Sequence, residues 1–273
     1  MKAKTSICLA LWLSLGFAAA ASAQTLKIGL AEDPDILDPT QGRTFVGRVV
    51  FAAMCAKLLD ISPNLQIVPQ LALDYKWAPD ARAVTFKLRQ GVKFQDGEPF
   101  NAAAVKFNIE RHKTMAGSNR KGELSAVSDV EVIDDYTVKF NLSSPFAPLL
   151  AQLTDRAGMM VSPKAATAEG ANFGNHPVCA GPFKFVERVP QDRIVLERFA
   201  DYWDKDKIHF DKVIYQPIPD STVRLSTLRS GGLDFIERVA APDLPTVRKD
   251  SRLKAAAIVE LGYQGITFNV ANG

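Results

Sequence analysis

The three histidines and the paired acidic residues are the side chains whose types could support catalysis or metal binding. His112, His176 and His209 are scattered along the chain, and none lies in the H-E-x-x-H spacing that binds zinc on a helix. Asp134 and Asp135 lie between two alternating apolar runs, where turn chemistry explains them. The sequence also lacks a G-x-S-x-G elbow, a glycine-rich phosphate loop and a C-x-x-C pair. We therefore expect no enzyme, no cofactor and no metal site.

The first 23 residues have the features of an export signal. Lys2 and Lys4 precede an apolar run over residues 7–17, and Ala21-Ser22-Ala23 is a small-x-small cleavage site. We expect cleavage after Ala23. The alternative is a retained membrane anchor, for which the apolar run is short.

Without the signal the chain is almost neutral. Lys2 and Lys4 leave with it, so the 33 basic residues fall to 31, against 30 acidic residues. Basic residues are interspersed with acidic ones, as at Glu187-Arg188, and form no basic stripe with interleaved aromatics. This pattern excludes a nucleic-acid-binding protein.

Two cysteines, Cys55 and Cys179, remain once Cys8 is removed with the signal. Exported proteins enter an oxidising compartment, where thiols tend to pair. We predict a disulfide that ties the first helix to the segment 174–181. The alternative is two buried free thiols.

The most regular pattern lies in the stretch 71–111. Val84, Phe86 and Leu88 alternate with polar residues, which predicts a strand with one buried face. The alternation resumes over 92–94 and predicts a second, short strand. Asn101 can then cap a helix through its side-chain oxygen.

The remaining pattern predicts an α/β chain in which short strands and helices are mixed. We expect strands over 24–30, 127–133, 136–142, 183–189, 193–199, 213–218, 233–236 and 253–259, and helices over 46–59, 146–153, 221–230 and 243–249. Residues 60–69 are expected to be a polar connector, Met159 and Met160 to lie in the core, and residues 201–203 to form a surface aromatic cluster.

The sequence LRQGVKFQDGEPFNAAAVKFNIER in the central stretch resembles the motif of the extracytoplasmic solute-binding proteins of peptide-type ABC transporters, family 5. Three later segments are also similar to family motifs, in the expected order: SPFAPLL, GPFKF and IPDSTVRLSTLRSGGLD. Two positions depart from the family pattern. The family often has Asp-Gly where this chain has Asp80-Ala81, and an acidic residue where it has Ala103 and Ala104.

The resemblance implies an α/β, periplasmic binding protein-like fold (class II, large peptide-binding type), of which this chain is the N-terminal lobe with an inserted smaller α+β subdomain. It implies a main subdomain over 24–45 plus 175–262, an inserted subdomain over 46–174, and the start of the crossing to a second lobe over 263–273. Relatives run to about 500 residues, well above the usual size of one domain. We therefore expect a fragment or truncated product that provides half of a binding cleft.

The resemblance further implies the substrate-binding component of an ABC importer, which captures di- or oligopeptides in the periplasm and delivers them to the membrane permease with its ATPase subunits. We expect a monomer that closes around its ligand. The expected ligand-binding residues are Arg43, Thr44, Phe45, Tyr263 and Gln264; the alternative is that residues 43–45 merely begin the next helix.

Several other functions stay open on the sequence alone. Members of the family also bind nickel chelates, haem, glutathione, opines and sugars. A truncated, secreted interaction or chaperone-like module without transport activity, and a secreted hydrolase, are the alternatives from other classes.

Overall fold

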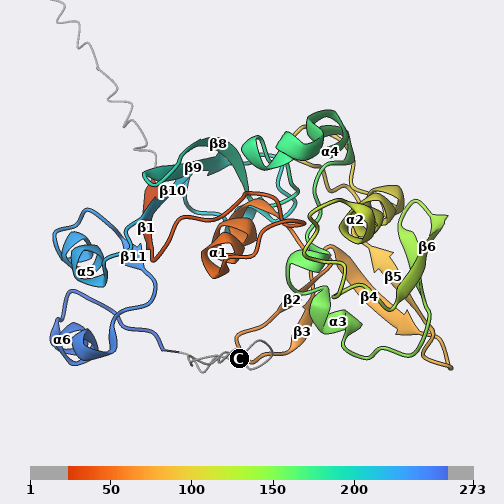
Figure 1. Ribbon diagram of the computed structural model, residues 1–273, viewed down its shortest axis with the longest axis horizontal. Coiled ribbons are helices and arrows are strands. Elements are labelled where there is room, and N and C mark those ends of the chain that lie inside the picture. The colour runs from red at the N-terminus through yellow and green to blue at the C-terminus, as the bar shows by residue number, and fades with distance from the viewer. Residues whose placement is uncertain (1–23, 258–273) are drawn as a thin grey trace, which may run out of the picture.

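The computed structural model describes residues 24–257, which form two main β-sheets at opposite ends of the molecule (Figure 1). The expected signal peptide, the segment 263–273, and with it Tyr263 and Gln264, lie outside the described residues. Within 24–257, none of the helices has the length and apolar character needed to cross a bilayer.

The larger sheet has five strands in the order β11-β1-β10-β9-β8. Its strands are β1 (Thr25–Leu30), β8 (Phe183–Val189), β9 (Arg193–Arg198), β10 (Lys212–Pro217) and β11 (Phe235–Ile236). β1 pairs in parallel with β10 on one side and β11 on the other, whereas the β10-β9 and β9-β8 pairs are antiparallel. Parallel strands need a crossover connection, and α5 (Ser221–Arg229) provides it between β10 and β11; α6 (Leu244–Lys249) follows.

The smaller sheet is antiparallel, in the order β4-β5-β7-β6, and α2 (Ala102–Thr114) packs on it. Its strands are β4 (Ala72–Trp77), β5 (Ala83–Leu88), β6 (Val127–Asp134) and β7 (Thr137–Leu142). Val84, Phe86 and Leu88 of β5 are buried, which confirms the predicted strand and its buried face. Phe86 meets Phe140 of β7 edge to face, with ring centroids 5.1 Å apart.

The start of α2 and the β6–β7 turn follow the local chemistry of their residues. The Asn101 side chain accepts a hydrogen bond from the Ala104 N–H at 3.0 Å, which confirms the predicted cap. The Asp134 carboxylate accepts the Tyr136 N–H at 2.8 Å, as expected for a turn residue. Ala81 has φ +55°, a left-handed conformation that glycine adopts more readily. This conformation explains why the family often has glycine at this turn.

Several sequence predictions were wrong in extent or type, and the predicted helix 146–153 is only the four-residue α3 (Leu149–Gln152). Residues 92–94 form no strand, because the chain turns back there: the Phe94 N–H bonds the Glu98 carbonyl at 2.8 Å. α1 (Phe45–Met54) is shorter than the predicted helix 46–59, since Cys55 is extended. The expected connector 60–69 overlaps a hairpin of β2 (Leu59–Ile61) and β3 (Ile67–Pro69). Residues 253–257 of the predicted last strand lie in no strand.

The two short helices of the middle region are α3 (Leu149–Gln152) and α4 (Pro163–Glu169). Met159 and Met160 are almost fully buried, which confirms that they belong to the core. The prediction of a surface aromatic cluster at residues 201–203 was wrong. Tyr202 is only 9% exposed, and burial raises its pKa to about 12, while the Arg89 guanidinium covers the Trp203 ring at 3.8 Å from the centroid.

The helix α1 packs with the five-stranded sheet. Its buried residues Val50, Phe51 and Met54 belong to the same apolar cluster as Leu30 of β1 and Ile194 of β9. A second cluster surrounds the four-stranded sheet, and apart from Met160 and Ala180 its buried members all lie between Ala56 and Ala157. We therefore propose that the inserted subdomain spans residues 56–158 rather than 46–174.

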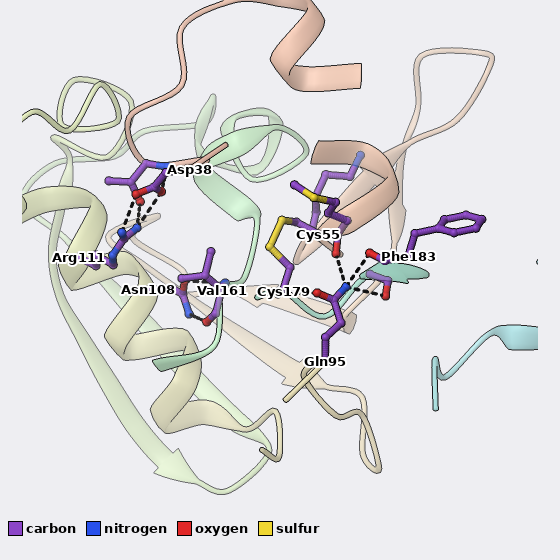
Figure 2. The surroundings of a disulfide bond; sticks show 12 residues. Asp38, Cys55, Gln95, Asn108, Arg111, Val161, Cys179 and Phe183 are labelled. Atoms are coloured by element: carbon purple, nitrogen blue, oxygen red, sulfur yellow. Dashed lines mark hydrogen bonds and ion pairs between the residues drawn. A yellow bond between two sulfur atoms is a disulfide. The ribbon is translucent and has the colours of Figure 1, made fainter. Parts of the chain in front are cut away.

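The junction between the two subdomains combines a covalent bond with hydrogen-bonded side-chain amides (Figure 2). The structure pairs Cys55 with Cys179 in a disulfide, with Cα atoms 4.8 Å apart. The Gln95 amide nitrogen donates to the carbonyls of Met54, Gly181 and Phe183 at 2.9–3.2 Å, and its oxygen accepts the Cys179 N–H at 2.9 Å. The end of α1 and the start of β8 are thereby held together from the smaller subdomain.

Asn108 makes a similar connection from α2. Its side-chain amide is fully buried, donates to the Val161 carbonyl and accepts the Val161 N–H, both at 2.9 Å. Buried amides with every polar atom bonded rigidify a junction. Gln95 and Asn108 therefore tie the smaller subdomain to the larger one at two places.

Candidate functional site

The carboxyl ends of the parallel strands β1, β10 and β11 lie at one edge of the five-stranded sheet. The chain leaves β1 into the loop 31–44, leaves β10 at Ile218, and leaves β11 at Glu237. β10 and β11 lie on opposite sides of β1, so the strand order reverses here. In open α/β sheets, ligands bind outside the carboxyl ends of the strands at such a switch point.

The last residues of the β1–α1 loop are fixed by a single carboxylate. Asp35 accepts hydrogen bonds from the Arg43 N–H at 2.9 Å and from the Thr44 hydroxyl at 3.1 Å. Burial raises the pKa of Asp35, but the hydrogen bonds from Arg43, Ile36 and Thr44 outweigh it and hold the pKa below its ordinary value. The ionised carboxylate is therefore the form that orders this loop.

Thr44 is the N-cap of α1, and Phe45 is its first residue. The Thr44 hydroxyl oxygen accepts the Gly47 N–H at 3.2 Å, which satisfies one of the free donors of the helix. Residues 44 and 45 thus do begin a helix, and they do so at the edge where the parallel strands end. Arg43 is exposed, and within residues 24–257 its side chain forms no ion pair or hydrogen bond.

Two guanidinium groups lie close to the Phe45 ring. The Arg238 guanidinium carbon is 4.8 Å from the Phe45 ring centroid, and that of Arg48 is 5.6 Å away. Arg48 also pairs with Asp155 at 2.8 Å, and Arg238 has φ +52°. We call Arg43, Thr44, Phe45, Arg48 and Arg238 the strand-end cluster. It offers cations and an aromatic ring on one edge, an arrangement suited to carboxylate-bearing ligands.

A buried arginine of α5 holds the other side of the cluster. Arg224 is 3% exposed and donates to the carbonyls of Pro219, Glu237 and Arg238 at 3.0–3.3 Å, and to that of Ile218. It therefore joins the chain after β10 to the chain after β11. Its bonds to the Glu237 and Arg238 carbonyls help to position the backbone that carries Arg238.

Beneath the β1–α1 loop, α2 contributes a second buried cation. Arg111 forms a bidentate pair with the fully buried Asp38, at 2.6 and 3.0 Å, and donates to the Thr40 hydroxyl (Figure 2). Nδ1 of the fully buried His112 lies 2.9 Å from the same hydroxyl. Burial, with repulsion from Arg111, lowers the pKa of His112 to about 3, against the attraction of Asp38.

Two surface hollows lie apart from the strand-end cluster. A groove of about 580 Å³ lies between α2 and α4 and is lined in part by Phe107 and Ala166. A hollow of about 420 Å³ beside β8 is lined in part by His176. Residues 43–45 line neither. Across 24–257, no group of three His, Cys, Asp or Glu side chains is arranged to hold a metal ion.

Sequence reasoning selected Arg43, Thr44 and Phe45 but missed Arg48 and Arg238. Arg238 lies 193 residues beyond Phe45, and no local pattern connects the two. One signal was present: the chain between the predicted strand 233–236 and the predicted helix 243–249 leaves a strand end, where sites form in α/β folds. Tyr263 and Gln264 lie outside the described residues.

This architecture, with an edge of parallel strands on a rigid two-part lobe, is that of a periplasmic binding protein lobe with mixed α and β content. The chain belongs to the bacterial extracellular solute-binding proteins, family 5 (Middle), whose family model matches residues 66–273.

Individual relatives agree with this assignment. The glutathione-binding protein GsiB of Pectobacterium atrosepticum is 31% identical over 235 residues, which are 86% of this chain and 46% of that protein. The solved structure of the binding protein AgaA from A. tumefaciens R10, in complex with agropinic acid, is 34% identical with a TM-score of 0.79, covering 83% of this chain and 46% of that one. DppA from Helicobacter pylori, in complex with the peptide STSA, is 27% identical with a TM-score of 0.75, covering 83% and 49%. The chain spans about half the length of the curated relatives it matches.

Proposed function

We propose that this chain is the N-terminal lobe of the solute-binding component of an ABC importer, which captures a peptide-like solute in the periplasm. The observation that carries the proposal is the strand-end cluster. Arg48 and Arg238 lie close to the Phe45 ring, and Arg43 precedes that ring by two residues, at the carboxyl ends of the parallel strands, where α/β folds bind ligands. The family assignment supports the transport role.

We further propose that the solute carries a free carboxylate. Arg43 is exposed and has no ion-pair partner among residues 24–257, so its charge is available to a ligand. Guanidinium groups bind carboxylates with two parallel hydrogen bonds. Di- and oligopeptides have such a group, and so do glutathione and agropinic acid, which the relatives' names mention.

Arg43, Thr44 and Phe45 stay the proposed ligand-binding residues, and we add Arg238. Tyr263 and Gln264 are retained as proposals from the sequence. Export through the signal peptide, with cleavage after Ala23, would bring the protein to the periplasm, where the permease and its ATPase subunits are the proposed partners.

A charge-removing substitution tests the proposed ligand class. In the protein expressed from its natural gene, Arg43→Gln should weaken binding of a carboxylate ligand roughly 10- to 100-fold, because a hydrogen bond to a charged group contributes about 1.5–3 kcal/mol. Arg82→Gln, in the exposed turn between β4 and β5, is the matched control and should bind like the wild type. Isothermal titration calorimetry with reduced glutathione and with the dipeptide Met-Leu measures both.

The same titration separates the rival functions. Equal affinities for wild type, Arg43→Gln and Arg82→Gln would contradict the assignment of Arg43. Absence of binding to any peptide or acidic probe, together with capture of a protein partner without ligand, would favour an interaction module.

A further inference from the structure

The carbonyl of Gly42 accepts hydrogen bonds from two buried arginines. Arg120 Nη2 lies 3.1 Å from the Gly42 oxygen, and Arg156 Nη1 lies 2.9 Å from it. The arginines are 3% and 8% exposed. They reach Gly42 from positions 78 and 114 residues further along the chain.

This arrangement carries an electrostatic cost. The two guanidinium charges lie close together in a buried position. Burial, together with repulsion from Arg120, lowers the pKa of Arg156. The acidic partners compensate only in part: Glu123 pairs with Arg120, and Asp155 is shared between Arg156 at 3.9 Å and Arg48 at 2.8 Å. One uncharged donor would satisfy a single carbonyl. The second cation therefore calls for a reason beyond hydrogen-bond satisfaction.

That reason lies in the peptide group between Gly42 and Arg43. Its oxygen is held by the two arginines, and its N–H is held by Asp35 at 2.9 Å. A peptide group is planar, so fixing both ends fixes its orientation and the direction in which the next residue leaves. The Gly42 N–H in turn bonds the Asp38 carbonyl at 2.7 Å. These hydrogen bonds therefore fix the direction in which the backbone enters Arg43.

Gly42 also lacks room to move. A Cβ atom at this position would lie 2.8 Å from the Phe51 ring of α1. The Gly42 backbone thus lies close to α1, and the two arginines bond its carbonyl. Preorganisation of this kind raises affinity, because less order has to be imposed when the ligand binds.

We infer that Arg120 and Arg156 are positioning residues of the ligand site, which orient Arg43 for a ligand carboxylate through the Gly42–Arg43 peptide group. The inference rests on the proposed function. It assigns to these two side chains an effect on ligand affinity that acts through Arg43 and does not need contact with the ligand.

A double-mutant cycle tests the inference in the protein expressed from its natural gene. Arg156→Gln should weaken binding of reduced glutathione or Met-Leu about tenfold in the wild-type background. In the Arg43→Gln background the same substitution should change affinity less than about twofold, because the residue through which it acts is gone. Arg156→Lys keeps the charge and a donor, and should recover most of the affinity.

A substitution of another buried residue, at the subdomain junction, serves as the control for a loss of stability. Asn108→Ala removes three buried hydrogen bonds, so it should lower the thermal midpoint while leaving the affinity of the folded protein unchanged. If Arg156→Gln does not fold, Arg120→Gln takes its place, since it removes the other donor on the same carbonyl.

The outcomes are distinct. Equal losses in both backgrounds contradict the inference and leave the proposed function intact, and so does a lowered thermal midpoint with unchanged affinity. Absence of binding by the wild-type protein contradicts the proposed function itself. A loss that disappears with Arg43 supports the positioning role.

Discussion

Protonation of His112 should destabilise this protein below neutral pH. The imidazole is fully buried between α2 and the β1–α1 loop, and its Nε2 atom finds no hydrogen-bond partner among residues 24–257. Because the Thr40 hydroxyl oxygen accepts a hydrogen bond from Arg111, we assign the hydroxyl as the donor to His112 Nδ1, which accepts. This assignment leaves the imidazole neutral, and the positive charge of Arg111 beside it opposes a second cation.

The size of the effect follows from the two pKa values. The native pKa is about 3, and that of an unfolded histidine is about 6.5. The folded pKa is depressed, so the unfolded state binds more protons between these limits. The stability contributed by neutral His112 is complete above about pH 6.5 and is lost as pH falls toward 3. Between pH 7 and pH 5 the loss is roughly 2 kcal/mol, from 1.36 kcal/mol per pH unit.

Urea unfolding at pH 7 and pH 5 measures this loss, with His112→Gln as the comparison. The variant lacks this imidazole, so between pH 7 and pH 5 its free energy of unfolding should fall by about 2 kcal/mol less than that of the wild type. Asp38, Arg111 and Arg120 face position 112 and are present in both proteins, so their own effect on stability drops out of the difference. Equal pH dependence in wild type and variant would refute the reasoning.

Two further predictions concern the junction between the subdomains. Cys55 and Cys179, which are 124 residues apart, should contribute no free thiol when the protein is denatured without reduction, and replacing both by serine should cost roughly 2–5 kcal/mol of stability; two titratable thiols from this pair would contradict the pairing. Gln95→Glu should destabilise more than Gln95→Met by thermal unfolding, because a carboxylate oxygen would replace the amide that donates to three carbonyls. The reverse order would show that the amide donors contribute little.

Local chemistry explains what could be predicted from the sequence. The alternation of Val84, Phe86 and Leu88 sets one face of β5, and the Asn101 cap needs only the three residues that follow it. These features depend on neighbours in the chain. The same holds for the turn at Asp134.

The features that escaped prediction depend on partners far along the chain. Residues 92–94 were predicted to form a short strand, but contacts of Phe94 with Glu98 and of Gln95 with Cys179 hold the backbone in a turn. Arg120 and Arg156 look like ordinary surface cations in the sequence. Their burial follows from a carbonyl 78 and 114 residues away, and no spacing rule indicates such a contact.

The strand-end cluster is an intermediate case. Its first half, at residues 43–45, follows from the loop after β1 and was selected from the sequence. Its second half, at Arg238, required the order of strands, because only the parallel pairing of β11 with β1 brings the two loops to the same edge.

The most direct test of the central claim is calorimetric titration of the protein expressed from its natural gene, with Met-Leu and with Met-Leu carrying a C-terminal amide. We predict saturable binding of one dipeptide per protein, and a loss of affinity of roughly tenfold or more when the carboxylate is replaced by the amide. Equal affinities for the two forms would contradict a site built around Arg43 and Arg238 for a carboxylate. Absence of binding to either dipeptide, to glutathione and to agropinic acid would contradict the proposed solute-binding role.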